Sequence, residues 1–134
     1  MIHRIEHDGS LIAIVLPHDH RPENIEFFTP NEFSQQLACM ARPAGYRIPP
    51  HVHKDVPREV THTLEVLFVR SGRVRVDLYA ADRSPIRSIE LVGGDVILLA
   101  SGGHGFTMLE PTEIVEVKQG PYAGVEDKER FEPS

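Results

Sequence analysis

Residues 64–79 of this chain read LEVLFVRSGRVRVDLY, and this stretch decides the class of the fold. From Arg73 to Tyr79, apolar residues alternate with polar or charged ones. An alternation with a period of two residues is typical of an antiparallel strand that buries one face. From Leu64 to Arg70, apolar residues occupy both faces, which predicts a strand covered on both sides. The Ser71-Gly72 pair between the two strands predicts a tight hairpin turn.

Glycine and proline interrupt the rest of the chain at short intervals. The 134 residues include 11 Pro and 10 Gly, and the longest stretch without either runs from Arg58 to Ser71. Helical bundles need longer uninterrupted segments, because a proline inside a helix costs about 3 kcal/mol and a glycine about 1 kcal/mol. The spacing therefore predicts a β-sandwich or a β-barrel of short strands. Further strands are expected at residues 2–6, 10–16, 86–91, 95–100, 104–109 and 113–119.

Two segments lack this alternation. Residues 17–30 contain three prolines and predict a long loop. Residues 31–42 fit either a helix, with Asn31 as its N-cap, or a strand that leads into the turn at Pro43-Ala44-Gly45.

The composition excludes several classes of protein. With 40% hydrophobic and 25% charged residues the chain is a folded protein, and its length predicts one domain. Its apolar runs are shorter than a membrane span, and residues 1–10 lack the apolar core of a secretory signal. A formal net charge of −6 without a basic stripe argues against a nucleic-acid partner. The single cysteine, Cys39, is typical of a reducing compartment, so we expect a cytoplasmic protein with no membrane partner.

Four residues are candidates for a metal site. His51 and His53 are two residues apart, and in a strand this spacing places both imidazoles on one face, where they can bind one ion. Glu65 lies in the strand that is apolar on both faces, where an unpaired carboxylate would be costly. His104 follows a Ser-Gly-Gly turn and shares a strand face with Phe106. Three nitrogens and one oxygen suit Fe, Mn, Ni, Co or Zn and leave positions open for a substrate.

Each candidate also has an ordinary interpretation. The His-x-His pair could be two half-exposed loop histidines, the glutamate could lie in water at the open end of its strand, and His104 could be a core or rim histidine. A second His-x-His pair, His18 and His20, lies in a proline-rich segment, and we interpret it as solvent-exposed.

The order of these residues resembles the two sequence motifs of the cupin superfamily. The first motif is a glycine, five residues, His-x-His, a gap, a glutamate, six residues and a glycine. It is matched here by Gly45, His51, His53, Glu65 and Gly72. The second motif is Gly-Asp, an apolar strand, Pro-x-Gly and a histidine, and it is matched by Gly94, Asp95, Gly102 and His104.

The resemblance implies an antiparallel double-stranded β-helix, or jelly-roll barrel, with a metal ion in its mouth. The whole chain, residues 1–134, would be one cupin domain, with a barrel core at residues 34–119 and a C-terminal arm at residues 120–134. A strand is then favoured over a helix within residues 31–42. The implied ligands of the divalent transition metal ion are His51, His53, Glu65 and His104.

The chain departs from the family pattern in both motifs. The gap between the His-x-His pair and the glutamate is longer than usual, and it contains Asp55, Glu59 and His62, any of which could replace or join a ligand. In the second motif Ala100 stands in place of the proline, and His104 comes one residue early. Both changes affect the expected geometry of the metal site.

The family contains dioxygenases, decarboxylases, isomerases, epimerases, sugar-binding regulators and storage proteins, so the fold alone does not select an activity. The first hypothesis is a metal-dependent enzyme, of the isomerase, epimerase or dioxygenase type. Its substrate would be a small polar metabolite, either sugar-like or a carboxylate or carbonyl compound. The alternatives are a non-catalytic cupin that binds a small ligand such as a sugar, and a purely structural barrel.

Other residues near the motifs could act on a substrate. Tyr46, Glu59 and His62 are candidates for acid–base catalysis, and Arg47 and Arg58 could hold an anionic group. Lys118 and Tyr122 could line a rim of the site.

The strand at residues 64–70 needs cover on the side away from the barrel, because it is apolar on both faces. An additional strand or a partner subunit could supply that cover. Because small cupins often dimerise, we expect a homodimer.

Overall fold

The computed structural model describes residues 1–133, which form β-strands and one short 3-10 helix. The elements are β1 (His3–His7), β2 (Ser10–Leu16), β3 (Ile25–Phe27), β4 (Ala38–Met40), β5 (Glu65–Ser71), β6 (Arg73–Tyr79), β7 (Pro85–Val92), β8 (Val96–Leu99), β9 (Gly103–Met108), β10 (Glu113–Lys118) and η1 (Gly124–Glu126). The strands pair antiparallel, which confirms the all-β antiparallel class. No helix in the described part of the chain has the length and apolar character needed to cross a membrane.

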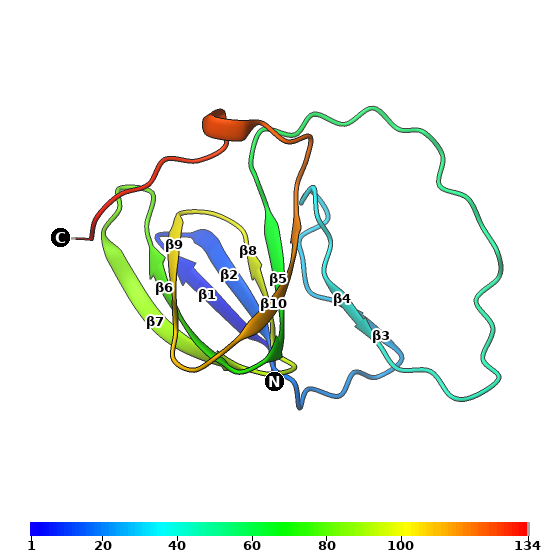
Figure 1. The fold of residues 1–134 in the computed structure, drawn as a ribbon. Helices are drawn as coiled ribbons and strands as arrows, with labels where there is room; N and C mark the ends of the chain where they lie inside the picture. Colours follow the sequence, from blue (N-terminus) through cyan, green and yellow to red (C-terminus); the bar gives the residue numbers. More distant parts are fainter. Residues whose placement is uncertain (134) are drawn as a thin grey trace. The chain divides into compact units, whose positions relative to one another are not determined.

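The chain divides into two compact units, which we describe separately. The sandwich unit comprises Met1–His20 and the chain from His62 onward, and it contains β1, β2 and β5 to β10 (Figure 1). The loop unit comprises Arg21–Thr61 and contains β3 and β4.

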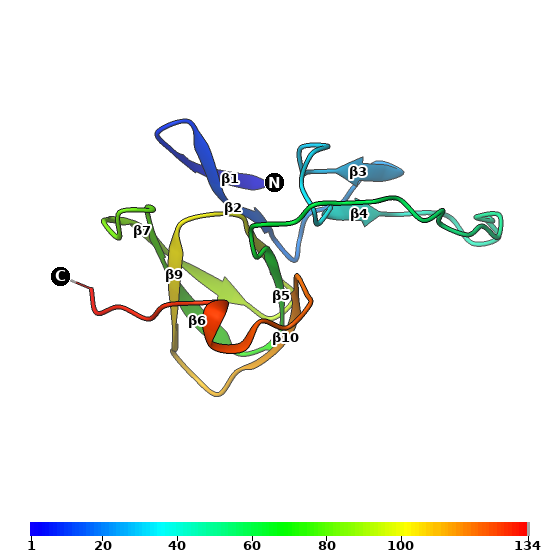
Figure 2. The same cartoon turned by 90° about the horizontal axis from the view of Figure 1, so that it is seen from above.

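Two sheets form the sandwich unit (Figure 1 and Figure 2). One has the strand order β1-β2-β8-β5-β10 and the other the order β7-β6-β9, and neither closes into a barrel over residues 1–133. Apolar side chains of both sheets pack between them, as the period-two alternation predicts. The buried core includes Ile12, Val15, Leu67, Val69, Ile97 and Leu99 from the first sheet and Val74, Val76, Leu78 and Leu91 from the second.

The hairpin predicted at Ser71-Gly72 is wrong. β5 pairs with β8 and β10, whereas β6 pairs with β7 and β9, so the chain crosses from one sheet to the other at Gly72. Gly72 has a φ of 95°, and a Cβ there would lie 2.4 Å from the Pro111 carbonyl oxygen. Alternation shows which face of a strand is buried and leaves its partner undetermined, so the sequence pattern is the same for a hairpin and for a crossing.

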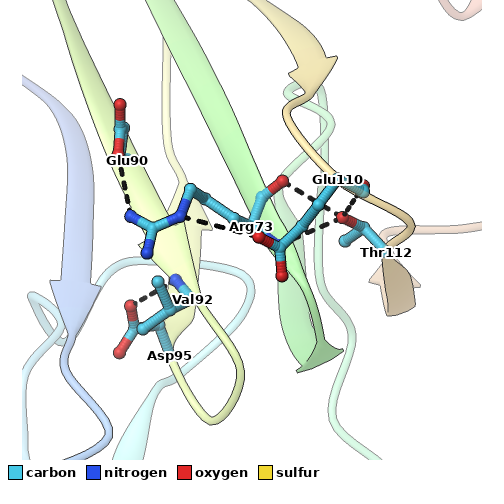
Figure 3. A network of polar contacts seen from close by, with 6 residues as sticks. All are labelled: Arg73, Glu90, Val92, Asp95, Glu110 and Thr112. Carbon is cyan, nitrogen blue, oxygen red and sulfur yellow. Dashed lines mark hydrogen bonds and ion pairs between the residues drawn. The ribbon is translucent and has the colours of Figure 1, made fainter.

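A polar network connects the start of β6 with β7 and with the turn after β9 (Figure 3). The Arg73 amide donates a hydrogen bond to Thr112 Oγ1 at 3.2 Å, and this hydroxyl donates to the Arg73 carbonyl at 3.1 Å. The Arg73 guanidinium is 3.1 Å from Glu90 and 3.9 Å from Glu110. Because these charges are about half exposed, each ion pair contributes little free energy.

The Gly94-Asp95 turn before β8 is held by His18. Asp95 is buried, and its carboxylate accepts hydrogen bonds from the Val92 amide at 2.8 Å (Figure 3), from the His18 amide at 2.8 Å and from His18 Nδ1 at 2.9 Å. A Cβ on Gly94 would lie 2.7 Å from the Cβ of His18. His18 is exposed, as predicted, with 53% of its side chain accessible, and the ring in addition pairs with a buried carboxylate.

In the loop unit, β3 and β4 form a two-stranded antiparallel sheet. Of the segment 31–42, only Ala38–Met40 is a strand. Before it, Gln36 Nε2 donates to the Phe33 carbonyl at 2.8 Å, and Gln36 Oε1 accepts from Thr29 Oγ1 at 2.7 Å. The bond from Gln36 to the backbone uses a carbonyl that a helix would use, and so competes with a helix. The long loop predicted before this segment is interrupted by β3.

Candidate functional site

Glu65 and His104 lie at one end of the core of the sandwich unit. Glu65 begins β5, and the next residues on its face, Leu67 and Val69, are buried in the core. His104 lies on β9, two residues before Phe106, which packs against the core. His104 Nε2 is 3.7 Å from Glu65 Oε2, and the two side chains are 28% and 16% exposed. The structure therefore brings two of the four candidate metal ligands together.

β10 adds Glu116 and Lys118 to this end of the core. Lys118 is the register partner of Glu65, and Glu116 shares a side-chain hydrogen bond with Glu65. Prediction from the sequence places Lys118 at a rim and does not name Glu116. A signal for both is present, because Ile114 packs on the core and Glu116 and Lys118 follow it at alternate positions, on the same face of the strand. We call the group of Glu65, His104, Glu116 and Lys118 the polar end of the sandwich unit.

Burial and neighbouring charge perturb the titration of this group. Burial raises the pKa of Glu65 to about 7, the hydrogen bond and the charge of Glu116 act in the same direction, and Lys118 opposes them. Burial also lowers the pKa of His104, against the opposing charge of Glu116. A carboxyl group with a pKa near neutrality can hold or release a proton under ordinary conditions, which is the property required of a general acid or base.

The C-terminal arm, residues 120–133, adds a further carboxylate. Asp127 Oδ2 is 3.0 Å from Lys118 Nζ, and Asp127 Oδ1 accepts a hydrogen bond from Thr63 Oγ1 at 2.7 Å. The Thr63 hydroxyl and the Lys118 ammonium lower the pKa of Asp127, and Asp127 in turn raises the pKa of Lys118. The negative charge of Asp127 also contributes to the raised pKa of Glu65. The arm therefore contributes directly to the electrostatics of the polar end.

Farther along, the arm is attached to the other sheet. The Phe131 ring meets the Tyr79 ring edge-on with centroids 5.1 Å apart, and the Arg83 guanidinium lies 5.2 Å from the Phe131 centroid. Arg83 also pairs with Glu129 at 3.0 Å. Figure 1 and Figure 2 both show the arm running from the end of β10 toward the sheet that contains β6 and β9.

The other two candidate ligands, His51 and His53, lie in the loop unit. Their ring centroids are 5.3 Å apart in an edge-on arrangement, and His51 Nδ1 is hydrogen-bonded to the Pro49 carbonyl at 2.9 Å. Both side chains are exposed, and residues 41–64 contain neither strand nor helix. The strand geometry that would place both imidazoles on one face is therefore not formed here.

The candidate acid–base residues are also in irregular segments. Tyr46 and Glu59 are exposed residues of the loop unit, and the Arg42 guanidinium lies 4.5 Å from the Tyr46 ring centroid. His62 is exposed and opens the second segment of the sandwich unit, directly before Thr63.

The donors fit part of a metal site. Glu65 and His104 supply one oxygen and one nitrogen at half-buried positions, which suits a divalent transition metal ion. Over residues 1–133, however, no group of three or more His, Cys, Asp or Glu side chains has the arrangement needed to hold a metal ion.

Comparisons of this chain with protein-family models, with curated proteins and with solved structures gave no match. The functional interpretation therefore depends on the chemistry of the residues themselves.

Proposed function

We propose that the protein binds a divalent transition metal ion at the polar end and is a metal-dependent enzyme that acts on a small polar metabolite. The observation that carries the proposal is the proximity of Glu65 and His104, 3.7 Å apart on strands of two different sheets. A buried carboxylate is costly unless a proton or a cation neutralises it, and the raised pKa of Glu65 reflects that cost. A bound cation would take the place of the proton.

The jelly-roll form of the fold is part of this proposal. It is supported by two antiparallel sheets that share one core and by the crossing of the chain between them at Gly72. Ligand sites are lined mainly by apolar side chains with a few polar groups among them, and in β-barrels they lie at the mouth. Glu65 and His104 are polar groups at one end of an apolar core.

The residues of the polar end have separate roles in this proposal. Glu65 and His104 hold the metal ion, Glu116 orients the Glu65 carboxyl group through their hydrogen bond, and Lys118 balances the negative charge. A bound metal ion supplies Lewis-acid polarisation of a substrate oxygen, or activation of dioxygen. His51 and His53 as further ligands stay a prediction from the sequence, as do Tyr46, Glu59 and His62 as proton donors or acceptors for an isomerase, epimerase or dioxygenase reaction.

Metal analysis of the full-length protein, purified without a histidine tag after expression with Fe, Mn, Ni, Co and Zn, tests this proposal. We expect about one transition metal ion per chain, lost in Glu65→Gln and His104→Ala. Glu113→Gln and His3→Ala are matched controls at exposed strand positions outside the polar end, and they should retain the metal. His51→Ala and His53→Ala then test whether these histidines are ligands. A wild-type protein that remains metal-free after loading would contradict the proposal.

A second candidate function is the binding of a small ligand, such as a sugar, without a metal ion and without catalysis. It is favoured by the absence of a three-residue metal-binding group among the described residues 1–133. The carboxyl groups of Glu65 and Glu116 could bind sugar hydroxyls directly. Saturable binding of a monosaccharide by protein kept in EDTA, together with no metal uptake, would support this function over the first.

A further inference from the structure

Thr63 and Lys118 converge on a single carboxylate. The hydroxyl of Thr63 donates to one oxygen of Asp127 at 2.7 Å, and the ammonium of Lys118 donates to the other at 3.0 Å. A hydroxyl and an ammonium that bind the two oxygens of one carboxylate form a charge-assisted recognition site for that group. The Asp127 side chain is only 12% exposed, so the carboxylate is largely enclosed.

The carboxylate in this position comes from the arm, which is not part of either sheet. The only regular structure of the described arm is the three-residue η1, and Tyr122 and Val125 are 87% and 95% exposed. Asp127 can therefore leave its position without breaking a bond between strands.

The position of this carboxylate is adjacent to the candidate site. Lys118, which binds Asp127 at 3.0 Å, is the register partner of Glu65 on the neighbouring strand. A ligand whose carboxylate replaced that of Asp127 would hold the rest of its structure beside Glu65 and His104, which are themselves 3.7 Å apart.

We propose that Thr63 and Lys118 form a carboxylate-binding subsite of the polar end, and that Asp127 fills this subsite until a small carboxylate ligand displaces it. This inference names the substrate class for the proposed function and rests on it for the role of Glu65 and His104. Competition with Asp127 raises the apparent dissociation constant of the ligand by the reciprocal of the fraction of time that the subsite is free of Asp127. If the arm is engaged for nine-tenths of the time, its release strengthens the apparent affinity about tenfold.

Acetate is the appropriate probe, because it has the chemical structure of the Asp127 side chain without its backbone. Full-length protein, freed of metal by a chelator that is then removed, is titrated with acetate at constant ionic strength and followed by the amide NMR shifts of Thr63 and Lys118. We expect Asp127→Asn to bind acetate about tenfold more tightly than the wild type, and acetamide to produce no saturable shift. Glu132→Gln removes the same charge from an exposed position of the arm and should bind like the wild type.

Two further variants test the subsite itself. Asp127→Asn combined with Lys118→Met, or with Thr63→Val, should lose the acetate binding gained by Asp127→Asn. Because two different residues are removed, poor folding of one variant does not prevent the test. Equal acetate affinity of the wild type and Asp127→Asn, or binding that survives both second substitutions, would overturn the proposal.

Release of the arm has an independent readout. Trypsin can cleave the arm after Lys128 and Arg130, and mass spectrometry identifies these two cuts. We expect acetate to accelerate them in the wild type, whereas acetamide should not. Unchanged cleavage in saturating acetate would show that the arm stays in place and would also overturn the proposal. Because the protein is metal-free throughout, failure of metal binding leaves these results unaffected, and the two proposals can fail separately.

Discussion

His104 Nε2 lies 3.7 Å from Glu65 Oε2, although the two residues belong to strands of different sheets. They meet because each occupies a core-facing position at the same end of the sandwich unit, beyond the last buried apolar residues. The protein places ionisable groups where a well-packed sandwich would place apolar ones. Such an arrangement lowers stability in a way that depends on ionisation, and the first prediction follows from it.

Glu65→Gln should stabilise the metal-free protein at high pH and not at low pH. The pKa of Glu65 rises from its ordinary value of 4.5 to about 7 on folding, so the folded state holds a proton that the unfolded state releases between these values. The proton on Glu65 contributes its full share to the stability of the folded protein below pH 4.5, and this contribution is lost as the pH rises through 7. We expect the variant to gain about 1–2 kcal/mol over the wild type at pH 8.5, allowing for water contact.

Urea unfolding of the two proteins in EDTA at pH 4.5 and pH 8.5 measures this gain. The groups that face Glu65 are His104, Glu116, Lys118 and Asp127, and none of them is changed in the variant. Glu113→Gln, on an exposed position of β10, serves as the control and should show no pH-dependent gain. An equal stability difference at both pH values would contradict the assigned cause.

Asp95→Ala should be strongly destabilising. The buried carboxylate accepts three hydrogen bonds, two of them from His18, which precedes Asp95 by 77 residues in the sequence. Removing a buried acceptor leaves the Val92 and His18 amides without this partner, which costs about 3 kcal/mol in total. His18→Ala keeps the backbone amide, removes the ring contact with Asp95 and should cost about 1 kcal/mol. Thermal or urea unfolding checks this order, with His3→Ala as the exposed control, and a larger loss for His18→Ala would contradict it.

Gly72→Ala should destabilise the protein more than Gly9→Ala. Both glycines have positive φ, 95° and 77° respectively, so an alanine is strained by about 1–2 kcal/mol at either position. Only at Gly72 does the added Cβ also clash, at 2.4 Å from the Pro111 carbonyl oxygen, whereas Gly9 has open space around it. We expect a further loss of at least about 2 kcal/mol for Gly72→Ala. Equal losses of stability in urea unfolding would show that an added Cβ at Gly72 does not clash with the Pro111 carbonyl oxygen.

The outer face of β5 and β10 should form a homodimer interface. Phe68, Val115 and Val117 are 42%, 43% and 57% exposed, Val115 is the register partner of Phe68, and β10 is the last strand of its sheet. Clustered apolar side chains at a sheet edge favour association with a second copy. We expect a dimer by light scattering at micromolar concentration. Val117→Lys should convert it into a monomer, and Val125→Lys, on the exposed arm, should not. A monomeric wild type would contradict this prediction.

Strand positions were the most predictable part of the fold. The strands expected at residues 10–16 and 73–79 have the bounds of β2 and β6, because the alternation of buried and exposed side chains is a local property of the chain. The segment at residues 31–42 was less predictable, since only three of its residues pair with another strand. There the side chain of Gln36 satisfies backbone groups that a helix or strand would use.

The candidate site was predictable only in part. Glu65 stands out in the sequence because an isolated carboxylate in an apolar strand requires a reason, and His104 stands out beside a flexible turn. Glu116 and Asp127 do not stand out, because a glutamate at an alternate position of an edge strand and an aspartate in a charged tail are ordinary surface patterns. Their importance depends on the register of β10 against β5 and on the path of the arm.

The sequence by itself determined that this is an all-β protein with short antiparallel strands, and it identified Glu65 as a residue that needs a partner and His104 as a candidate ligand. Only the tertiary structure decided that the chain changes sheets at Gly72, that His18 holds Asp95, and that Asp127 binds Thr63 and Lys118. The physical reason is the range of the interactions. Burial of one strand face leaves a local pattern in the sequence, whereas pairing, pKa shifts and carboxylate recognition depend on groups that are adjacent only after folding.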